Sequence, residues 1–78
     1  MAETVNMVEM EALLAADTEG SYREATLVRL RDQAIELKQR LDKGVSPEEY
    51  GDLERVVLAL ETAASTVDRV WRQLHRRT

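Results

Sequence analysis

The sequence predicts an all-α protein: an antiparallel coiled-coil helical hairpin preceded by a short N-terminal helix. Leu, Ala, Val, Glu and Arg dominate the composition, and Phe is absent, which is typical of helical proteins. Two stretches carry apolar residues at alternating spacings of three and four, and a strong turn signal separates them. These three observations together favour two paired helices over any sheet-containing fold.

We expect residues 1–78 to form a single domain, because 78 residues are few even for one core. A chain of this size usually needs disulfides, a metal or a partner to be stable. It has no Cys and one His, so neither a disulfide nor a typical zinc site is expected. The absence of Cys fits a reducing cytoplasm.

The first element is a short helix near residues 5–16, followed by a loop from Asp17 to Gly20. The tetrapeptide Ser21-Tyr22-Arg23-Glu24 has the S-x-x-E pattern of a capping box. It predicts a middle helix near residues 22–43.

The turn between the two long helices lies around residue 45. Gly44 suits the left-handed position that follows a helix end. Ser46 can cap the next helix, Pro47 fits its first turn, and Glu49 completes a second capping box. This signal predicts a final helix near residues 47–76.

Apolar stripes on the two long helices predict how the helices pair. In an antiparallel hairpin, residues equally distant from the turn face each other. The expected pairs are Leu41 with Tyr50, Leu37 with Leu53, Ala34 with Val57, Leu30 with Leu60, and Leu27 with Ala64. The stripes therefore meet in register along the hairpin.

The final helix is longer than the middle one, roughly 45 Å against roughly 33 Å at the helical rise per residue. Trp71 and Leu74 consequently extend beyond the start of the middle helix and need another cover. Either a partner supplies that cover, or the N-terminal segment with Val8, Leu13 and Leu14 folds back over them. Fold-back is the expectation for the free protein.

Both long helices carry more apolar residues than a hairpin can bury. Val28 and Ile35 form a second row on the middle helix, and Val56, Ala63 and Val70 form one on the final helix. Exposing a Val or Ile that could be buried forfeits about 1.5–3 kcal/mol. A third surface is therefore expected: the chain's own N-terminus, a second copy or a different protein.

Catalytic patterns are not expected in this sequence. Ser21 and Ser46 are explained by helix capping, and His75 suits the C-terminal turn of a helix. No Gly-rich phosphate loop or metal-ligand pattern occurs, so we expect no enzyme activity, cofactor or metal. The net charge of -4 disfavours nucleic acid despite an arginine cluster near the C-terminus. The N-terminus resembles neither a signal peptide nor a membrane span.

Residues 23–75 resemble the small YscE/SsaE/EscE-type co-chaperones of bacterial type III secretion. The shared pattern is a leucine-striped helix, a short Gly-containing turn and an x-x-Tyr motif that opens the next helix. Here the motif is Glu48-Glu49-Tyr50, followed by Leu53, Leu60-Glu61 and Ala64. Glu9 to Leu14 also matches loosely.

The resemblance implies a protein of the bacterial cytoplasm that pairs with a larger, tetratricopeptide-like co-chaperone. Such a pair keeps the needle subunit, or another exported subunit, soluble and unpolymerised. On this reading the partner-binding residues are Val56, Ala63 and Val70, with Val28, Ile35 and Trp71. The alternatives are a secreted or needle-like hairpin subunit, and a structural coiled-coil homodimer.

Overall fold

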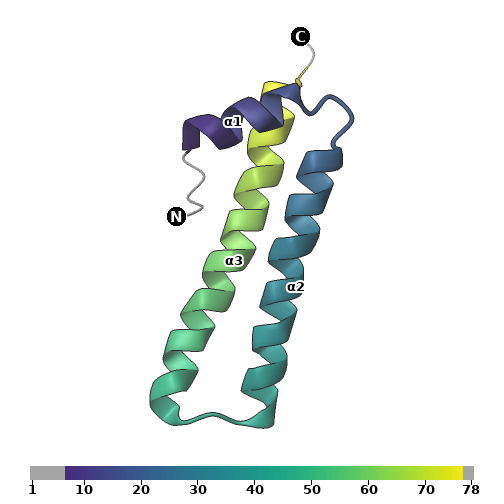
Figure 1. Ribbon diagram of the computed structural model, residues 1–78. Helices are drawn as coiled ribbons and strands as arrows, with labels where there is room; N and C mark the ends of the chain where they lie inside the picture. The colour runs from purple at the N-terminus through teal and green to yellow at the C-terminus, as the bar shows by residue number, and fades with distance from the viewer. Residues whose placement is uncertain (1–6, 77–78) are drawn as a thin grey trace, which may run out of the picture.

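The computed structural model describes residues 7–76 as three helices with no strand among them (Figure 1). They are α1 (Met7–Ala16), α2 (Ser21–Lys43) and α3 (Pro47–Leu74). Helices α2 and α3 run antiparallel and are joined by a short turn at one end. At the other end α1 crosses α3, and most contacts in the molecule lie between α2 and α3 (Figure 1). The predicted all-α hairpin with a short N-terminal helix is confirmed.

The helix bounds lie close to those expected from the sequence. The middle helix begins at Ser21, one residue before the predicted start, and ends at Lys43 as predicted. The final helix begins at Pro47 and ends at Leu74, two residues early. Residues 5 and 6 of the predicted N-terminal helix lie outside the described residues, and from Met7 to Ala16 the prediction is confirmed.

The turn between α2 and α3 uses the residues that the sequence singled out. Gly44 has a φ of 104°, which favours glycine, and its N–H donates to the Leu41 carbonyl at 3.1 Å. Its ψ of 130° lies outside the left-handed helical region, so the residue leads out of the helix towards an extended conformation. The Ser46 hydroxyl accepts the Glu49 N–H at 3.2 Å, and the Glu49 carboxylate lies 3.5 Å from Arg40 on α2.

The predicted capping box at Ser21 is wrong, because Asp17 caps α2 instead. Its carboxylate accepts the backbone N–H of Tyr22 at 3.0 Å and that of Arg23 at 2.8 Å. Ser21 is the first helical residue, and its hydroxyl also donates to Asp17, at 3.4 Å. Gly20, with a φ of 81°, gives the loop the left-handed bend that brings Asp17 back to the helix start. A carboxylate satisfies two orphan N–H groups here, where a hydroxyl satisfies one.

The core lies at the end of the hairpin away from the turn. Leu14 of α1, Leu27 of α2, and Ala64 and Val67 of α3 form one cluster, each at most 7% exposed. Leu27 and Ala64 are a pair that the sequence predicted. Ion pairs Arg23–Asp68 and Arg40–Glu49 join residues nearly equidistant from the turn at both ends, which fits the predicted register. Towards the turn the buried side chains are small, Ala34 and Val57.

Leu27→Ala tests whether this cluster holds the fold together. Leu27 is 2% exposed, so truncation should leave a cavity and lower the free energy of unfolding by about 2–5 kcal/mol. The neighbouring Val28 is 46% exposed, and Val28→Ala should change that free energy by less than about 1 kcal/mol. Urea unfolding followed by circular dichroism measures both. Equal losses in the two variants would contradict this core.

Asp17→Asn tests the cap through its pH dependence. Burial acts to raise the pKa of Asp17, but hydrogen bonds from the N–H groups of Arg23 and Tyr22 outweigh it and lower the pKa below 3.8. The native state therefore binds fewer protons than the unfolded chain, and the stabilisation is present at neutral pH and lost as the pH falls below about 3.8. Asn does not titrate, so the urea midpoints of wild type and Asp17→Asn should differ more at neutral pH than in acid.

The exposed residue Asp32 provides the control for this comparison, because Asp32→Asn alters the charge equally without touching the cap. Its difference from wild type should be small at both pH values. If Asp17→Asn shows a difference independent of pH, the cap is not ionic.

Candidate partner-binding surface

The end of the hairpin away from the turn is closed by α1 and the overhanging part of α3. Leu14 is buried in the core, and Met10 packs against the same cluster. The indole Nε1 of Trp71 donates to the Asp17 carbonyl at 2.8 Å. His75 stacks near Trp71, with ring centroids 4.5 Å apart, and its Nε2 donates to the Leu14 carbonyl at 2.7 Å. These contacts attach the α1–α2 loop to the end of α3.

Arg23 completes this closure from the side of α2. Its guanidinium lies 4.8 Å from the centre of the Trp71 ring and donates to Asp68 at 2.8 Å. Its Nε is buried without a hydrogen-bond partner among the residues that the structure describes. We name the set Asp17, Arg23, Trp71 and His75 the clasp. Within the clasp, the Trp71 side chain already contacts Asp17, Arg23 and His75 of its own chain.

The fold-back of the N-terminal segment is confirmed through Leu14, which lies in the core. Leu13 instead faces outwards and is 48% exposed, and Leu74 is 43% exposed. The side chain of Val8 lies outside the described residues. Among the described side chains of α1, Ala12, Leu13, Ala15 and Ala16 are apolar and exposed. These residues leave an apolar surface on α1 beside the core.

The predicted row Val56, Ala63 and Val70 lies on the flank of α3 that α1 covers. Val70 packs against the core cluster and lines a small cavity of about 50 Å³ with Met10 and Leu14 of α1. Ala63 is partly buried, and Val56, nearer the turn, is 45% exposed. The row is thus covered at one end and open at the other.

Val28 and Ile35 lie on the other flank of the hairpin. They are 46% and 51% exposed. Ile35 borders a shallow groove of about 400 Å³ whose other lining residues are Arg31, Ala34, Lys38, Glu61, Ala64 and Ser65. The helical spacing that puts Ile35 beside Glu61 and Ser65 puts Val56 and Ala63 on the opposite side of α3. The structure therefore does not bring the two predicted rows together.

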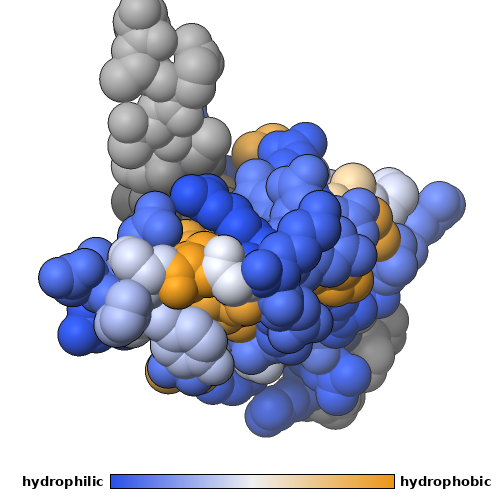
Figure 2. Space-filling view, turned by 90° about the horizontal axis from the view of Figure 1, so that it is seen from below, coloured by the Kyte–Doolittle hydropathy of each residue, from blue (hydrophilic) through white to orange (hydrophobic). Residues whose placement is uncertain are grey.

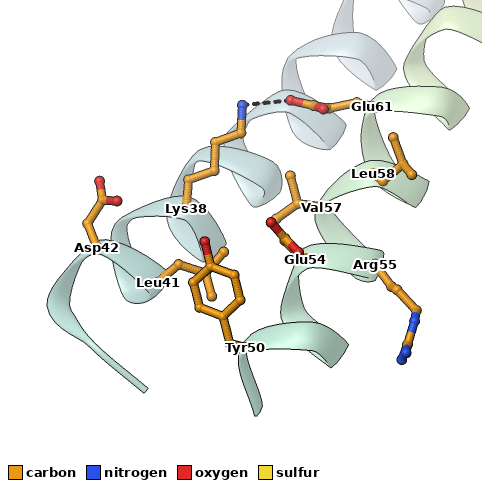
Figure 3. A pocket seen from close by; sticks show the side chains of 9 residues that line it. All are labelled: Lys38, Leu41, Asp42, Tyr50, Glu54, Arg55, Val57, Leu58 and Glu61. Carbon is orange, nitrogen blue, oxygen red and sulfur yellow. Dashed lines mark ion pairs between the residues drawn. The ribbon is translucent and has the colours of Figure 1, made fainter. Parts of the chain in front are cut away.

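A larger groove near the turn was missed by the sequence reasoning. Its volume is about 560 Å³, and it lies between the lower halves of α2 and α3 (Figure 3). Leu41 of α2 and Tyr50 of α3 both line it, and the most exposed of the large apolar residues, Leu58, borders it at 65% exposure (Figure 3). Seen from the turn end, hydrophobic atoms reach the surface between hydrophilic side chains (Figure 2). Leu58 falls outside the main stripe of α3, and that isolated position was the available signal.

The two grooves form one continuous face because both are lined by Lys38 and Glu61. The Lys38 ammonium lies 2.7 Å from the Glu61 carboxylate, and this ion pair bridges the two helices (Figure 3). We name this face the trough. It comprises the lining residues of both grooves, from Arg31, Ile35 and Ser65 at one end to Leu41, Tyr50 and Leu58 near the turn. Its apolar floor and charged rims suit the binding of another protein surface.

The residues described by the structure contain no group of three His, Asp or Glu side chains that could hold a metal ion. Within the same residues no helix combines the length and apolar character needed to cross a membrane. What the described surface offers chemically is apolar area and paired charges, on the trough and on the Val56 flank.

One family model matches the chain, over residues 7–74, and its description is "Type III secretion system, cytoplasmic E component of needle". Searches of curated proteins and of solved structures found no significant match. The family model spans most of the 78 residues, which confirms the resemblance to YscE-type small type III secretion proteins. The chain belongs to this family.

Proposed function

We propose that this member of the type III secretion family works as a co-chaperone. It pairs with a larger, tetratricopeptide-like chaperone in the bacterial cytoplasm, and the pair keeps the needle subunit, or another exported subunit, soluble and unpolymerised. The family is described as a cytoplasmic component of the needle system and is not a known enzyme family. This description supports the proposal at the level of the system, and the structure supports it at the level of the surface.

The observation that carries the proposal is the exposed apolar surface of a folded chain. Val28, Ile35 and Val56 are each about half exposed although the hairpin around them is complete. When such branched apolar side chains stay in water, a small domain forfeits stabilising free energy that a covering partner would supply. A protein that acts by binding another protein needs such apolar surface and needs no catalytic group.

The flank with Val56 and Ala63 is the docking surface that we propose for the chaperone. Val56 is exposed, Ala63 is small, and the row leads up to α1, where Leu13 adds a further exposed apolar side chain. Helices of a repeat protein stack side by side and leave their own apolar ridges at the end of the stack. Such a ridge could lie along α3 and reach α1, in the manner of helix–helix packing.

The remaining predicted residues have different parts in this proposal. Val70 and Trp71 support the docking surface from below, because Val70 packs on the core and Trp71 holds the loop after α1. Val28 and Ile35 lie on the other flank and would contact a partner only if it wraps around the hairpin.

Val56→Asp tests the docking surface directly. A carboxylate in the centre of an apolar interface would be desolvated without a partner, so the affinity for the chaperone should fall at least about tenfold, corresponding to 1.4 kcal/mol or more. The variant is co-expressed with a tetratricopeptide-like chaperone of the same secretion system, and co-purification and calorimetric affinity are measured. Because Val56 is exposed, the helicity of the free chain should be unchanged.

Thr62→Asp is the matched control, since Thr62 is an exposed residue of the same helix and receives the same new side chain. Ile35→Asp reports whether the other flank takes part. Undiminished binding by Val56→Asp would reject this surface. If no encoded chaperone binds the wild-type chain and the purified protein forms filaments, the protein is a needle-like subunit and the proposed function fails.

A further inference from the structure

We propose that, without its partner, the chain forms a homodimer through the trough, in which α2 of each copy packs against α3 of the other. The dimer is a four-helix bundle with both turns at the same end. This inference concerns a different flank from the Val56 surface and does not rest on the proposed function.

The trough and the helix surface beside it expose large apolar side chains. Leu58 is 65% exposed and Ile35 is 51% exposed, and Val28 lies one heptad before Ile35 on the same face of α2. In the groove beside Ile35 the floor consists of Ala34 and Ala64, at 3% and 4% exposure. Large side chains at the rims and small ones in the centre allow a second pair of helices to approach closely.

The two rims of the trough differ in net charge. The α2 rim carries Arg31, Lys38 and Asp42, and the α3 rim carries Glu54, Glu61 and Arg55, so the α2 rim is net basic and the α3 rim is net acidic. Among the described residues, Arg31 and Glu54 have no ion-pair partner within their own chain. The basic rim and the acidic rim of one chain are thus complementary, and each retains an unpaired charge.

Two-fold symmetry decides which rims of the two copies meet. A two-fold axis along the hairpin places the basic α2 rim of one copy against the acidic α3 rim of the other, and does so twice. Ile35 and Leu58, which lie on opposite rims, then face each other across the interface. A two-fold axis at right angles to the hairpin would instead put α2 against α2 and α3 against α3, so that like charges meet. Charge therefore favours the arrangement with both turns at one end.

The Lys38–Glu61 ion pair is compatible with this interface. Its side chains are 54% and 46% exposed, and exposed pairs of this kind contribute little to stability. Both groups can exchange their partner within the chain for the equivalent group of the second copy. Dimerisation through the trough therefore requires little change in the structure of the monomer.

The first experiment measures the mass of the full-length chain by sedimentation equilibrium over a range of concentrations. Wild type should dimerise, and Leu58→Asp should weaken the dimer at least about tenfold. The matched control is Leu13→Asp, since Leu13 is also exposed, at 48%, but lies on α1, away from the trough. Val56→Asp should also leave the dimer intact, which separates this inference from the proposed docking surface.

Charge reversal tests the arrangement of the two copies. One variant combines Arg31→Glu with Lys38→Glu, so that both rims are acidic, and a second combines Glu54→Lys with Glu61→Lys, so that both are basic. Each variant alone should be monomeric with unchanged helicity. Their mixture should form a heterodimer, because each acidic rim then faces a basic one, and Leu58→Asp in both should abolish it.

Several results would overturn the inference. They are a wild-type chain that stays monomeric at high concentration, a Leu58→Asp dimer as stable as wild type, and a mixture of the charge variants that stays monomeric. A monomeric wild type whose binding to the chaperone is lost in Leu58→Asp would assign the trough to that foreign partner instead.

Discussion

The unequal length of the two hairpin helices is the constraint on which the rest of the structure depends. Helix α3 has 28 residues and α2 has 23, so the last turns of α3 have no partner on α2. The chain covers them with its own N-terminal segment: Leu14 completes the core, and the Trp71 indole is hydrogen-bonded to the loop that follows α1. Large buried side chains, an ion pair and a stacked guanidinium are consequently concentrated at that end.

The opposite end is built differently. In the half of the hairpin towards the turn the buried side chains are Ala34 and Val57, and leucines of the stripe such as Leu41 and Leu53 remain partly exposed. The exposed apolar residues Leu58 and Tyr50 lie in this half, and Val56 lies there on the other flank. A chain that closes one end firmly and leaves apolar surface elsewhere is well suited to a role that depends on association. Both proposed interfaces draw on this division.

Much of the fold could be predicted from the sequence because its determinants are local or periodic. The leucine stripe set the pairing of α2 with α3, and Ser46-Pro47 set the start of α3. The start of α2 was assigned to the wrong cap, because a loop carboxylate that folds back from Asp17 competes with the Ser21 hydroxyl, and a four-residue pattern does not include it. The surface was harder to predict. The sequence shows which residues of each helix are apolar, but the flank on which a row lies depends on how both helices are rotated about their axes. For this reason Val28 was grouped with Val56, and Leu58 was overlooked.

Amide hydrogen exchange of the isolated chain tests the division between a closed and an open end most directly. The slowest-exchanging amides are expected around Leu27 in α2 and Val67 in α3, where exchange requires global unfolding. Amides around Leu41 and Leu53 should exchange faster, through local opening of the turn end. Equal protection along both helices, or slowest exchange beside the turn, would contradict this division of the hairpin into a closed and an open end.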